Sequence, residues 1–279
     1  MKLLVIGAAG QLGSTFADVP GHEVVGVTRG DVDVTRHAAL LALVDDVRPD
    51  AVVNCTAYNN VDGAEDDAAS ALAVNALAVR SMASAAARVG AALVHYSTDF
   101  VFDGEASSPY REDDRARPVS VYGCSKLLGE WFAQEAPRWY VLRVESLFGG
   151  PQARSSVDKI AAALREGRKT PVFSDRVVTP SYVADVRDAT LQLLARGVPS
   201  GVFHCVNSGQ ATWLEVGEHV ARLLAADPAL LVPTSVRDVT LRARRPVYCA
   251  LSNAKLAAAT GAALPSWQDA IDRYVRTLR

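Results

Sequence analysis

Near the N-terminus lies the segment Lys2-Leu3-Leu4-Val5-Ile6-Gly7-Ala8-Ala9-Gly10-Gln11-Leu12-Gly13. Its first five residues form a β-prone apolar run, which is typical of a buried parallel strand. The spacing G-x-x-G-x-x-G that follows allows a tight turn into a helix, expected from Ser14, and a close approach of the backbone to a pyrophosphate. We therefore expect a dinucleotide-binding loop here, with a purely structural glycine turn as the alternative.

Strands and helices are predicted to alternate after this segment. Strand patterns cover residues 23–28, 51–54, 92–97 and 139–144, and helical patterns cover residues 36–47, 66–89 and 120–135. Short connections between alternating elements predict a parallel sheet with helices on both faces. Ligands bind at the carboxyl edge of such a sheet. The segments expected to face one crevice there are 7–13, 28–29, 54–58, 97–99 and 144–148.

The second half of the chain alternates less regularly. Short strands are predicted at 171–173 and 201–206, helices at 183–195, 213–224 and 267–278, and a basic loop at 241–246. The predicted fold class is α/β: a Rossmann-type doubly wound parallel sheet with a smaller C-terminal α/β substrate lobe. We expect residues 1–150 to form the NAD(P)-binding domain, rejoined by part of 175–210, and 151–279 to form mainly the substrate lobe.

Composition excludes several classes of protein. The 279 residues are 49% hydrophobic and 22% charged, which is ordinary for a globular protein. A net charge of −2 gives no electrostatic case for nucleic acid or an anionic membrane as partner. No apolar run approaches the length of a membrane span, and the cysteines and acidic pairs lack metal-ligand spacing. We expect a cytoplasmic protein with reduced thiols and no metal site.

The residues after the second strand bear on which cofactor is bound. An acidic residue at this point would hold the 2′-hydroxyl of NAD. The chain has Thr28 and Arg29 instead, and an arginine there can pair with the 2′-phosphate of NADP. This pattern favours NADPH and leaves NADH open, because Arg29 could also be a solvated loop residue. Asp33 and Val34 follow, where a loop could contact the adenine, and a helix cap is the alternative for Asp33.

The segment Tyr122-Gly123-Cys124-Ser125-Lys126 is predicted to lie on a helix capped by Ser120. Residues four apart share one helix face, so Tyr122 and Lys126 should be neighbours. An adjacent ammonium group lowers the pKa of a phenol, which would make Tyr122 a proton donor near neutral pH. The alternative is a surface tyrosine beside a solvated lysine.

Three polar residues stand within apolar patterns. Asn75 is out of place in a helix by propensity, and it could hydrogen-bond to the backbone inside the fold. His95 and His204 lie in apolar strands, and we expect packed core residues rather than ligands there.

Together these motifs resemble the dTDP-4-dehydrorhamnose reductase family of extended short-chain dehydrogenases/reductases. The resemblance covers essentially the whole chain. It rests on the glycine loop and on Arg48-Pro49-Asp50-Ala51-Val52-Val53-Asn54, Ala57-Tyr58-Asn59-Asn60-Val61-Asp62-Gly63-Ala64-Glu65, His95-Tyr96-Ser97-Thr98-Asp99-Phe100-Val101-Phe102-Asp103-Gly104, Pro109-Tyr110-Arg111-Glu112-Asp113-Asp114, Val121-Tyr122-Gly123-Cys124-Ser125-Lys126-Leu127, Arg244-Arg245-Pro246 and Leu264-Pro265-Ser266-Trp267.

The resemblance implies a role for each matching residue. Tyr122 would be the general acid, Lys126 its partner and Thr98 a hydrogen-bond donor to the reacting carbonyl. The implied cofactor-binding residues are Gly7, Gly10, Gln11, Leu12, Gly13, Arg29, Asp33, Val34, Thr56, Ala57, Tyr58, Tyr122 and Lys126. The implied substrate-binding residues are Thr98, Asp99, Phe100, Val61 and Ser146.

The chain also departs from the family pattern around the sugar. The family usually has tyrosine where this chain has Phe100, and tryptophan where it has Ser146. Glu145 brings a carboxylate into the same neighbourhood, and Val178 stands where the family tends to have glycine. These changes leave the implied reduction machinery complete and put the identity of the sugar in doubt.

The implied activity is NADPH-dependent reduction of the 4-keto group of a dTDP-4-keto-6-deoxyhexose, a step of dTDP-rhamnose or other deoxysugar biosynthesis. One alternative is a ketoreductase for a different sugar nucleotide in a specialised pathway. Another is a non-catalytic NADP-binding regulatory subunit, as in the β subunit of methionine adenosyltransferase. We expect a monomer or homodimer.

Overall fold

The computed structural model describes residues 1–278, and its centre is a six-stranded parallel sheet in the order β10-β5-β4-β3-β1-β2. The strands are β1 (Lys2–Ile6), β2 (Glu23–Val27), β3 (Ala51–Asn54), β4 (Ala92–Thr98), β5 (Trp139–Val144) and β10 (Gly201–His204). The chain reverses its direction of winding between β1 and β3, which places a crevice at the carboxyl ends of these strands. This confirms the predicted fold class.

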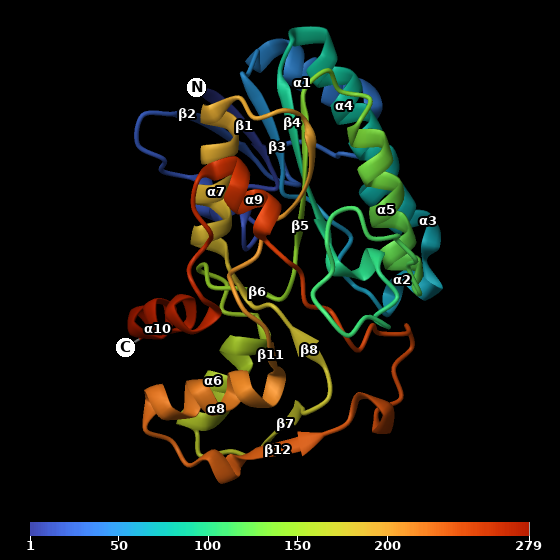
Figure 1. Cartoon of the computed structure of the whole chain (residues 1–279). Coiled ribbons are helices and arrows are strands. Elements are labelled where there is room, and N and C mark those ends of the chain that lie inside the picture. The colour runs from blue at the N-terminus through green and yellow to red at the C-terminus, as the bar shows by residue number, and fades with distance from the viewer. Residues whose placement is uncertain (279) are drawn as a thin grey trace.

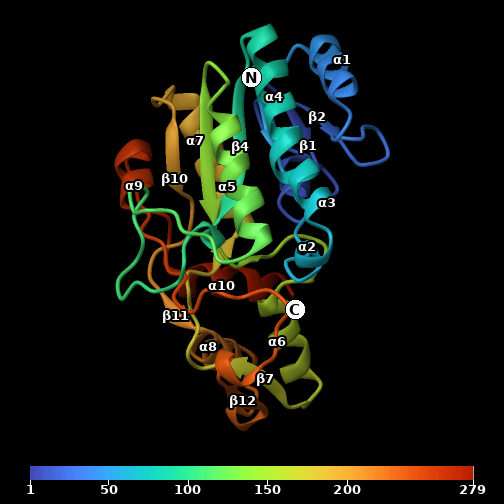
Figure 2. The same ribbon diagram turned by 90° about the vertical axis from the view of Figure 1, so that its right-hand side faces the viewer.

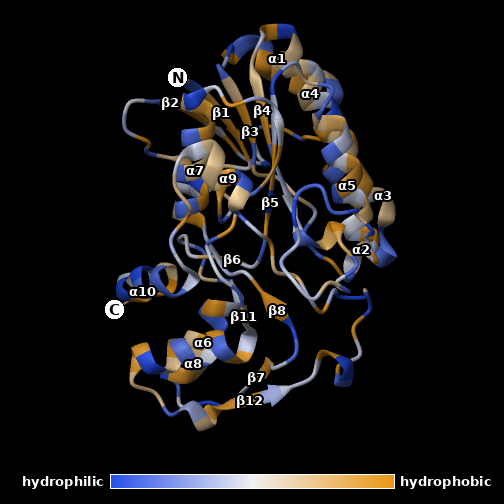
Figure 3. Ribbon diagram, in the orientation of Figure 1, coloured by the Kyte–Doolittle hydropathy of each residue, from blue (hydrophilic) through white to orange (hydrophobic). Residues whose placement is uncertain are grey.

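Helices cover both faces of the sheet, as Figures 1 and 2 show. One face is covered by α1 (His37–Val47), α4 (Ala78–Val89) and α5 (Val121–Ala133), and the other by α7 (Val183–Arg196) and α9 (Ala254–Thr260). The central strands β1 and β3 are hydrophobic along almost their whole length (Figure 3), because both of their faces are buried, whereas the edge strand β2 is partly exposed. Leu3 and Val5 point to one layer and Leu4 and Ile6 to the other.

A smaller lobe lies below the carboxyl edge of the sheet (Figure 1). It has its own core, to which Val157, Trp213, Val216 and Ile271 contribute. Its helices are α6 (Ser156–Arg165), α8 (Trp213–Leu224) and α10 (Trp267–Thr277), and its short strands are β6 (Leu147–Phe148), β7 (Thr170–Phe173), β8 (Val177–Val178), β9 (Ser181–Tyr182), β11 (Ala211–Thr212) and β12 (Leu231–Thr234). The chain leaves this lobe for α7 and β10, and β10 pairs with β5 in the main sheet.

Two predicted helices are different in the structure. The helix expected from Ser14 is a single 3₁₀ turn, Gly13–Phe16. The stretch predicted at 66–89 is divided into α2 (Gly63–Asp66), α3 (Ala68–Leu72), a π-helical turn (Ala73–Leu77) and α4. Helices α6 and α9, strand β12 and the two-residue strands β6, β8, β9 and β11 were not predicted. The two-residue strands are too short to carry a recognisable periodicity, whereas α6 has ten residues and a Ser155 cap that could have indicated it.

Residues 68–89 are long and apolar enough to cross a membrane by length and composition. The prediction that no apolar run approaches the length of a membrane span is therefore wrong for this stretch. In the structure Val79, Met82 and Ala83 of this stretch are fully buried against the sheet. The apolar composition is therefore explained by packing in the core of the main domain.

Candidate active site

The glycine loop turns the chain at the end of β1. Gly7 has φ +90°, and a Cβ there would lie 3.0 Å from the carbonyl carbon and oxygen of Cys55 on the neighbouring strand. A Cβ on Gly13 would lie 2.2 Å from the Gly7 carbonyl oxygen. Glycine is required at both positions, because only glycine lets these backbone segments approach so closely.

A cleft with a volume of about 1190 Å³ extends from the glycine loop to helix α5, which carries Tyr122 and Lys126. Its lining includes twelve of the thirteen residues predicted to bind the cofactor: Gly7, Gly10, Gln11, Leu12, Arg29, Asp33, Val34, Thr56, Ala57, Tyr58, Tyr122 and Lys126. Gly13 is the exception. It is buried, and it serves to pack the 3₁₀ turn against Gly7 rather than to line the cleft.

The loop after β2 is held in shape by its own side chains. The Asp31 carboxylate accepts hydrogen bonds from the backbone N and Oγ1 of Thr28, at 2.8 and 2.7 Å. Asp33 accepts in the same way from Thr35, at 3.0 and 2.7 Å. Asp33 therefore forms a turn and is not a helix cap, since α1 begins after Arg36. Arg29 is exposed at the mouth of the cleft and accessible to an anionic ligand.

Helix α5 begins where Ser120 caps it, with Gly123 N donating to Ser120 Oγ at 3.1 Å, as predicted. One turn in, Lys126 is 2% exposed and its ammonium donates to the Tyr96 carbonyl at 2.5 Å. Burial lowers the pKa of Lys126 to about 8. The predicted alternative of a solvated lysine is therefore wrong.

His95 connects Lys126 to the interior of the sheet. Its Nε2 lies 3.3 Å from Lys126 Nζ, and its Nδ1 lies 3.0 Å from Asn54 Nδ2. Burial, followed by the charge of Lys126, lowers the pKa of His95, so the ring is neutral. His95 is the packed core residue that was predicted, as is the fully buried His204. The contact of His95 with Lys126 was not predicted, and no sequence signal indicated it.

Tyr122 differs from its prediction. Its pKa is raised, first by burial and then by the charge of Asp99, while a hydrogen bond with Thr98 opposes the shift. The expected lowering by the adjacent ammonium is absent because Lys126 points to the Tyr96 carbonyl instead. Tyr122 therefore holds its proton more firmly than a free phenol.

Asn75 occupies the π-helical turn and has the structural role that was considered for it. It is fully buried. Its Oδ1 accepts from Tyr58 N at 2.9 Å, and its Nδ2 donates to Tyr58 O at 3.1 Å and to Ser125 Oγ at 2.9 Å. Asn75 thus connects the cleft segment at Tyr58 to Ser125 of helix α5.

The five residues predicted to bind the sugar do not line the large cleft. Thr98 and Phe100 contact Tyr122 instead: Thr98 through a hydrogen bond, and Phe100 with ring centroids 5.5 Å apart. Asp99 accepts from Thr98 Oγ1 at 2.9 Å. Ser146 donates to Glu145, and Val61 precedes Asp62, which pairs with Arg245 at 2.7 Å.

Two arginines from the smaller lobe complete this region. The guanidinium groups of Arg176 and Arg245 lie 5.5 and 5.7 Å from the centre of the Phe100 ring. Arg245 belongs to the basic loop singled out in the sequence, but nothing in the sequence indicated Arg176. The position of Arg176 depends on how the smaller lobe packs beneath the sheet.

Among residues 1–278, one group of side chains has metal-ligating atoms close together: Asp99, Glu145 and Cys249. The Arg176 guanidinium faces the same group, with Nη2 3.6 Å from Cys249 Sγ. Because the guanidinium already supplies positive charge there, we assign no metal ion to the group, and the expectation of no metal site stays a prediction.

A parallel sheet with a glycine loop, and a Tyr-x-x-x-Lys pair in the same cleft, define an NAD(P)-dependent oxidoreductase with a Rossmann fold. The cleft fits a dinucleotide, because its floor is the glycine-loop backbone and the exposed Arg29 stands at its mouth. The chain belongs to the family described as RmlD substrate binding domain, whose model matches residues 1–279.

Individual relatives agree with this family. A dTDP-4-dehydrorhamnose reductase from Burkholderia thailandensis is 37% identical over 100% of this chain and 99% of its own. A probable dTDP-4,6-dihydroxy-2-methyloxan-3-one 4-ketoreductase from Streptomyces antibioticus is 36% identical over 97% of this chain and 93% of its own. The crystal structure of a Bacillus anthracis dTDP-4-dehydrorhamnose reductase in complex with NADP has a TM-score of 0.93 and 27% identity, with 99% of each chain covered.

Proposed function

We propose that the protein uses NADPH to reduce the 4-keto group of a dTDP-4-keto-6-deoxyhexose. The observation that carries the proposal is that Tyr122 and Lys126 line the same cleft as the glycine loop. A proton donor and a dinucleotide site are thereby brought to one place, as keto reduction requires. Similarity to a dTDP-4-dehydrorhamnose reductase over the full chain supports the substrate class.

The chain's own residues have distinct tasks in this reaction. NADPH, when bound, supplies the hydride to the carbonyl carbon. Tyr122 gives its proton to the carbonyl oxygen. The Thr98 hydroxyl, which donates to Asp99 Oδ1 at 2.9 Å, would have to turn from Asp99 to donate to the same carbonyl oxygen. Lys126 would hold the nicotinamide ribose, and its positive charge would favour the tyrosinate that remains.

We also propose a cofactor preference and a cellular compartment for the protein. Arg29, exposed at the mouth of the cleft, would pair with the 2′-phosphate, so NADPH should bind more tightly than NADH. All four cysteines are free, which fits a reducing compartment such as the cytoplasm. We expect a monomer or homodimer with a small-molecule substrate and no nucleic-acid or membrane partner.

A second candidate is a 4-ketoreductase for a different sugar nucleotide. It is favoured by Phe100, Glu145 and Ser146, which replace the family's usual residues where the sugar would bind. Similarity to the probable dTDP-4,6-dihydroxy-2-methyloxan-3-one 4-ketoreductase from Streptomyces antibioticus, which is named for a different dTDP-sugar, supports this alternative. A non-catalytic regulatory subunit is disfavoured, because Thr98, Tyr122 and Lys126 are all present and in place.

The test is NADPH oxidation with dTDP-4-keto-6-deoxyglucose, with and without a 3,5-epimerase, and with NADH in parallel. Turnover that requires the epimerase would support the rhamnose-type reaction. Turnover without it would indicate another deoxysugar. Tight NADPH binding with no turnover on any keto-sugar nucleotide would contradict the proposal and favour the regulatory role.

A further inference from the structure

Residues 149–154, which we call the crossing segment, pack against the glycine loop on their way to the smaller lobe. The Gln11 side chain donates to the carbonyl oxygens of Leu147 and Gly149, at 3.3 and 3.0 Å. Gly150 has φ +82°, and a Cβ there would lie 2.8 Å from the Gln11 carbonyl oxygen. Glycine at this position therefore lets the crossing segment approach the backbone of the glycine loop closely.

The crossing segment also brings two polar side chains to the cofactor cleft. The Gln152 side chain donates to the Ala9 carbonyl oxygen of the glycine loop, and both Gln152 and Arg154 line the cleft. Arg154 is exposed, and within residues 1–278 its side chain has no hydrogen bond or ion pair. Its guanidinium group is thus available to a ligand in the cleft.

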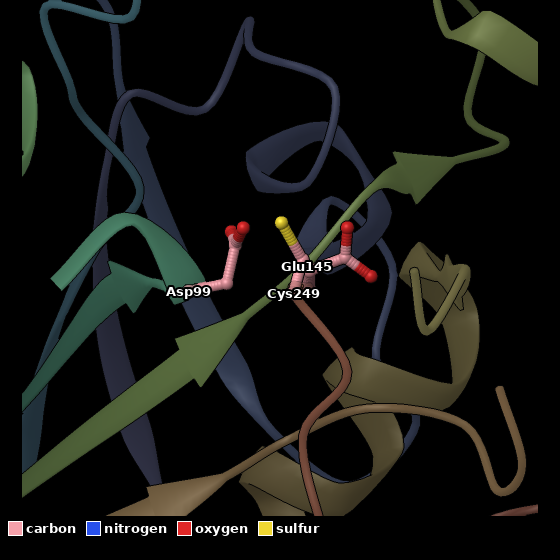
Figure 4. Close-up of side chains that lie close together, drawn as sticks. All are labelled: Asp99, Glu145 and Cys249. Atoms are coloured by element: carbon pink, nitrogen blue, oxygen red, sulfur yellow. The ribbon is translucent and has the colours of Figure 1, made fainter. Parts of the chain in front are cut away.

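Both ends of the crossing segment are anchored. Figure 4 shows the chain continuing from Glu145, at the end of β5, toward β6 and the crossing segment. The buried Glu145 carboxylate accepts a hydrogen bond from Thr179 N of the smaller lobe. At the other end Ser155 caps α6, with Asp158 N donating to Ser155 Oγ at 3.2 Å. The backbone of Arg154 is therefore held beside the cleft by the surrounding structure.

The cleft has a specific use for the charge of Arg154. Among the described residues that line it, the cationic ones are Arg29, Lys126 and Arg154. Arg29 is assigned to the 2′-phosphate and Lys126 to the nicotinamide ribose. The pyrophosphate lies between these two parts of the cofactor, and the glycine loop that receives it has no charged side chain. Because Gln152 fixes the crossing segment to that loop, the pyrophosphate is the anion beside Arg154.

Resting on the use of NADPH proposed above, we propose that Arg154 binds the pyrophosphate of the cofactor. Its guanidinium adds a charged contact to those made by the backbone N–H groups of the glycine loop. NADPH and NADH carry the same pyrophosphate, so Arg154 contributes equally to the binding of both. Arg29 differs in this respect, because its partner is present only in NADPH.

Calorimetric titration of the full chain with NADPH and with NADH tests the proposal. Arg154→Ala should raise the Kd of both cofactors by the same factor, about five- to tenfold. Arg154→Lys keeps the charge without the planar fork and should recover part of this loss. An unchanged Kd for both cofactors in Arg154→Ala would overturn the proposal. So would a loss confined to NADPH, because Arg154 would then bind the 2′-phosphate.

Two controls separate a pyrophosphate contact from less specific effects. Lys159→Ala removes an exposed cation near the start of the same helix α6 that does not line the cleft, and it should leave both Kd values unchanged. Adenosine 2′-monophosphate, which lacks the pyrophosphate, should bind Arg154→Ala as well as wild type. An equal loss in Lys159→Ala, or an equal loss for adenosine 2′-monophosphate, would overturn the proposal.

Binding and turnover measured on the same variants separate this proposal from the proposed function. Cofactor binding that depends on Arg154, without turnover on any keto-sugar nucleotide, would reject the keto reduction and leave the pyrophosphate contact standing. Normal turnover in wild type with unchanged Kd values in Arg154→Ala would reject the contact alone. A wild-type protein that binds neither NADPH nor NADH would reject both.

Discussion

Tyr122 and Lys126 are both shaped by burial in the protein. Burial raises the pKa of Tyr122 and lowers that of Lys126 to about 8. A neutral His95 and the Tyr96 carbonyl hold Lys126 at the sheet. We infer that cofactor binding draws the lysine toward Tyr122, because the ribose hydroxyls offer it hydrogen bonds in the cleft.

Tyr122→Phe removes the proton donor and should lower kcat by about 10²- to 10⁴-fold. NADPH affinity should stay within about threefold of wild type, because the cleft keeps its shape. Stopped-flow turnover and fluorescence titration measure the two quantities. Tyr140→Phe, which loses a buried hydroxyl bonded to the Val198 carbonyl at 2.7 Å, is the control and should keep full turnover. Near wild-type turnover in Tyr122→Phe would disprove the assignment of the general acid.

Arg29→Ala should weaken NADPH binding and leave NADH binding nearly unchanged. A hydrogen bond to a charged group contributes about 1.5–3 kcal/mol, which is about 10- to 150-fold in Kd. Calorimetric titration with both cofactors measures it. Arg36→Ala removes an exposed arginine of the same loop that does not line the cleft, and it should leave both affinities unchanged. Equal weakening for NADH would mean that Arg29 does not read the 2′-phosphate.

The π-helical turn before α4, Ala73–Leu77, is held in shape by the side chain of Asn75. The extra residue in the turn lets Asn75 satisfy both backbone groups of Tyr58, and π turns of this kind often occur at functional sites. A continuous helix would place Asn75 differently and leave the cleft segment unsupported.

Asn75→Ala should lower the free energy of unfolding by about 2–4 kcal/mol, because buried polar groups of Tyr58 lose their partners. Urea unfolding measures the change. Asn60→Ala, at an exposed position where the side chain caps Gly63, should cost less than about 1 kcal/mol. If both variants lost the same small amount of stability, Asn75 would not be the residue that holds the turn.

The elements that could be predicted are those whose own sequence carries a clear apolar pattern or a helix cap. The strands of the main sheet follow from apolar runs such as residues 3–6, and α5 follows from the Ser120 cap and its apolar spacing. The 3₁₀ turn after the glycine loop and the division of residues 63–89 were not predictable. They depend on the contact of Gly13 with Gly7 and of Asn75 with Tyr58, which are tertiary interactions.

In the whole molecule, the site is assembled from both lobes. The cofactor cleft belongs to the sheet and was predictable from strand ends alone. Arg176 and Cys249 come from the smaller lobe and meet Asp99 and Glu145 only because that lobe folds beneath the sheet. No pattern in the sequence encodes this meeting, so the buried group could not be predicted even though Glu145 was recognised as unusual.

The stability of the whole molecule should respond to pH through two buried groups of opposite sign. The pKa of Glu145 is raised from 4.5 to about 8, so the folded state binds more protons in this range and the free energy of unfolding falls as pH rises. The pKa of Lys126 is lowered from 10.5 to about 8, so above pH 8 the unfolded state binds more protons and the free energy of unfolding rises again.

Urea unfolding at pH 5, 8 and 10 measures both slopes. Relative to wild type, Glu145→Gln should gain stability between pH 5 and 8, and Lys126→Met should lose stability between pH 8 and 10. Glu105→Gln controls for the loss of an exposed carboxylate, and a Glu145→Gln difference that is the same at pH 5 and 8 would show that Glu145 is ionised throughout.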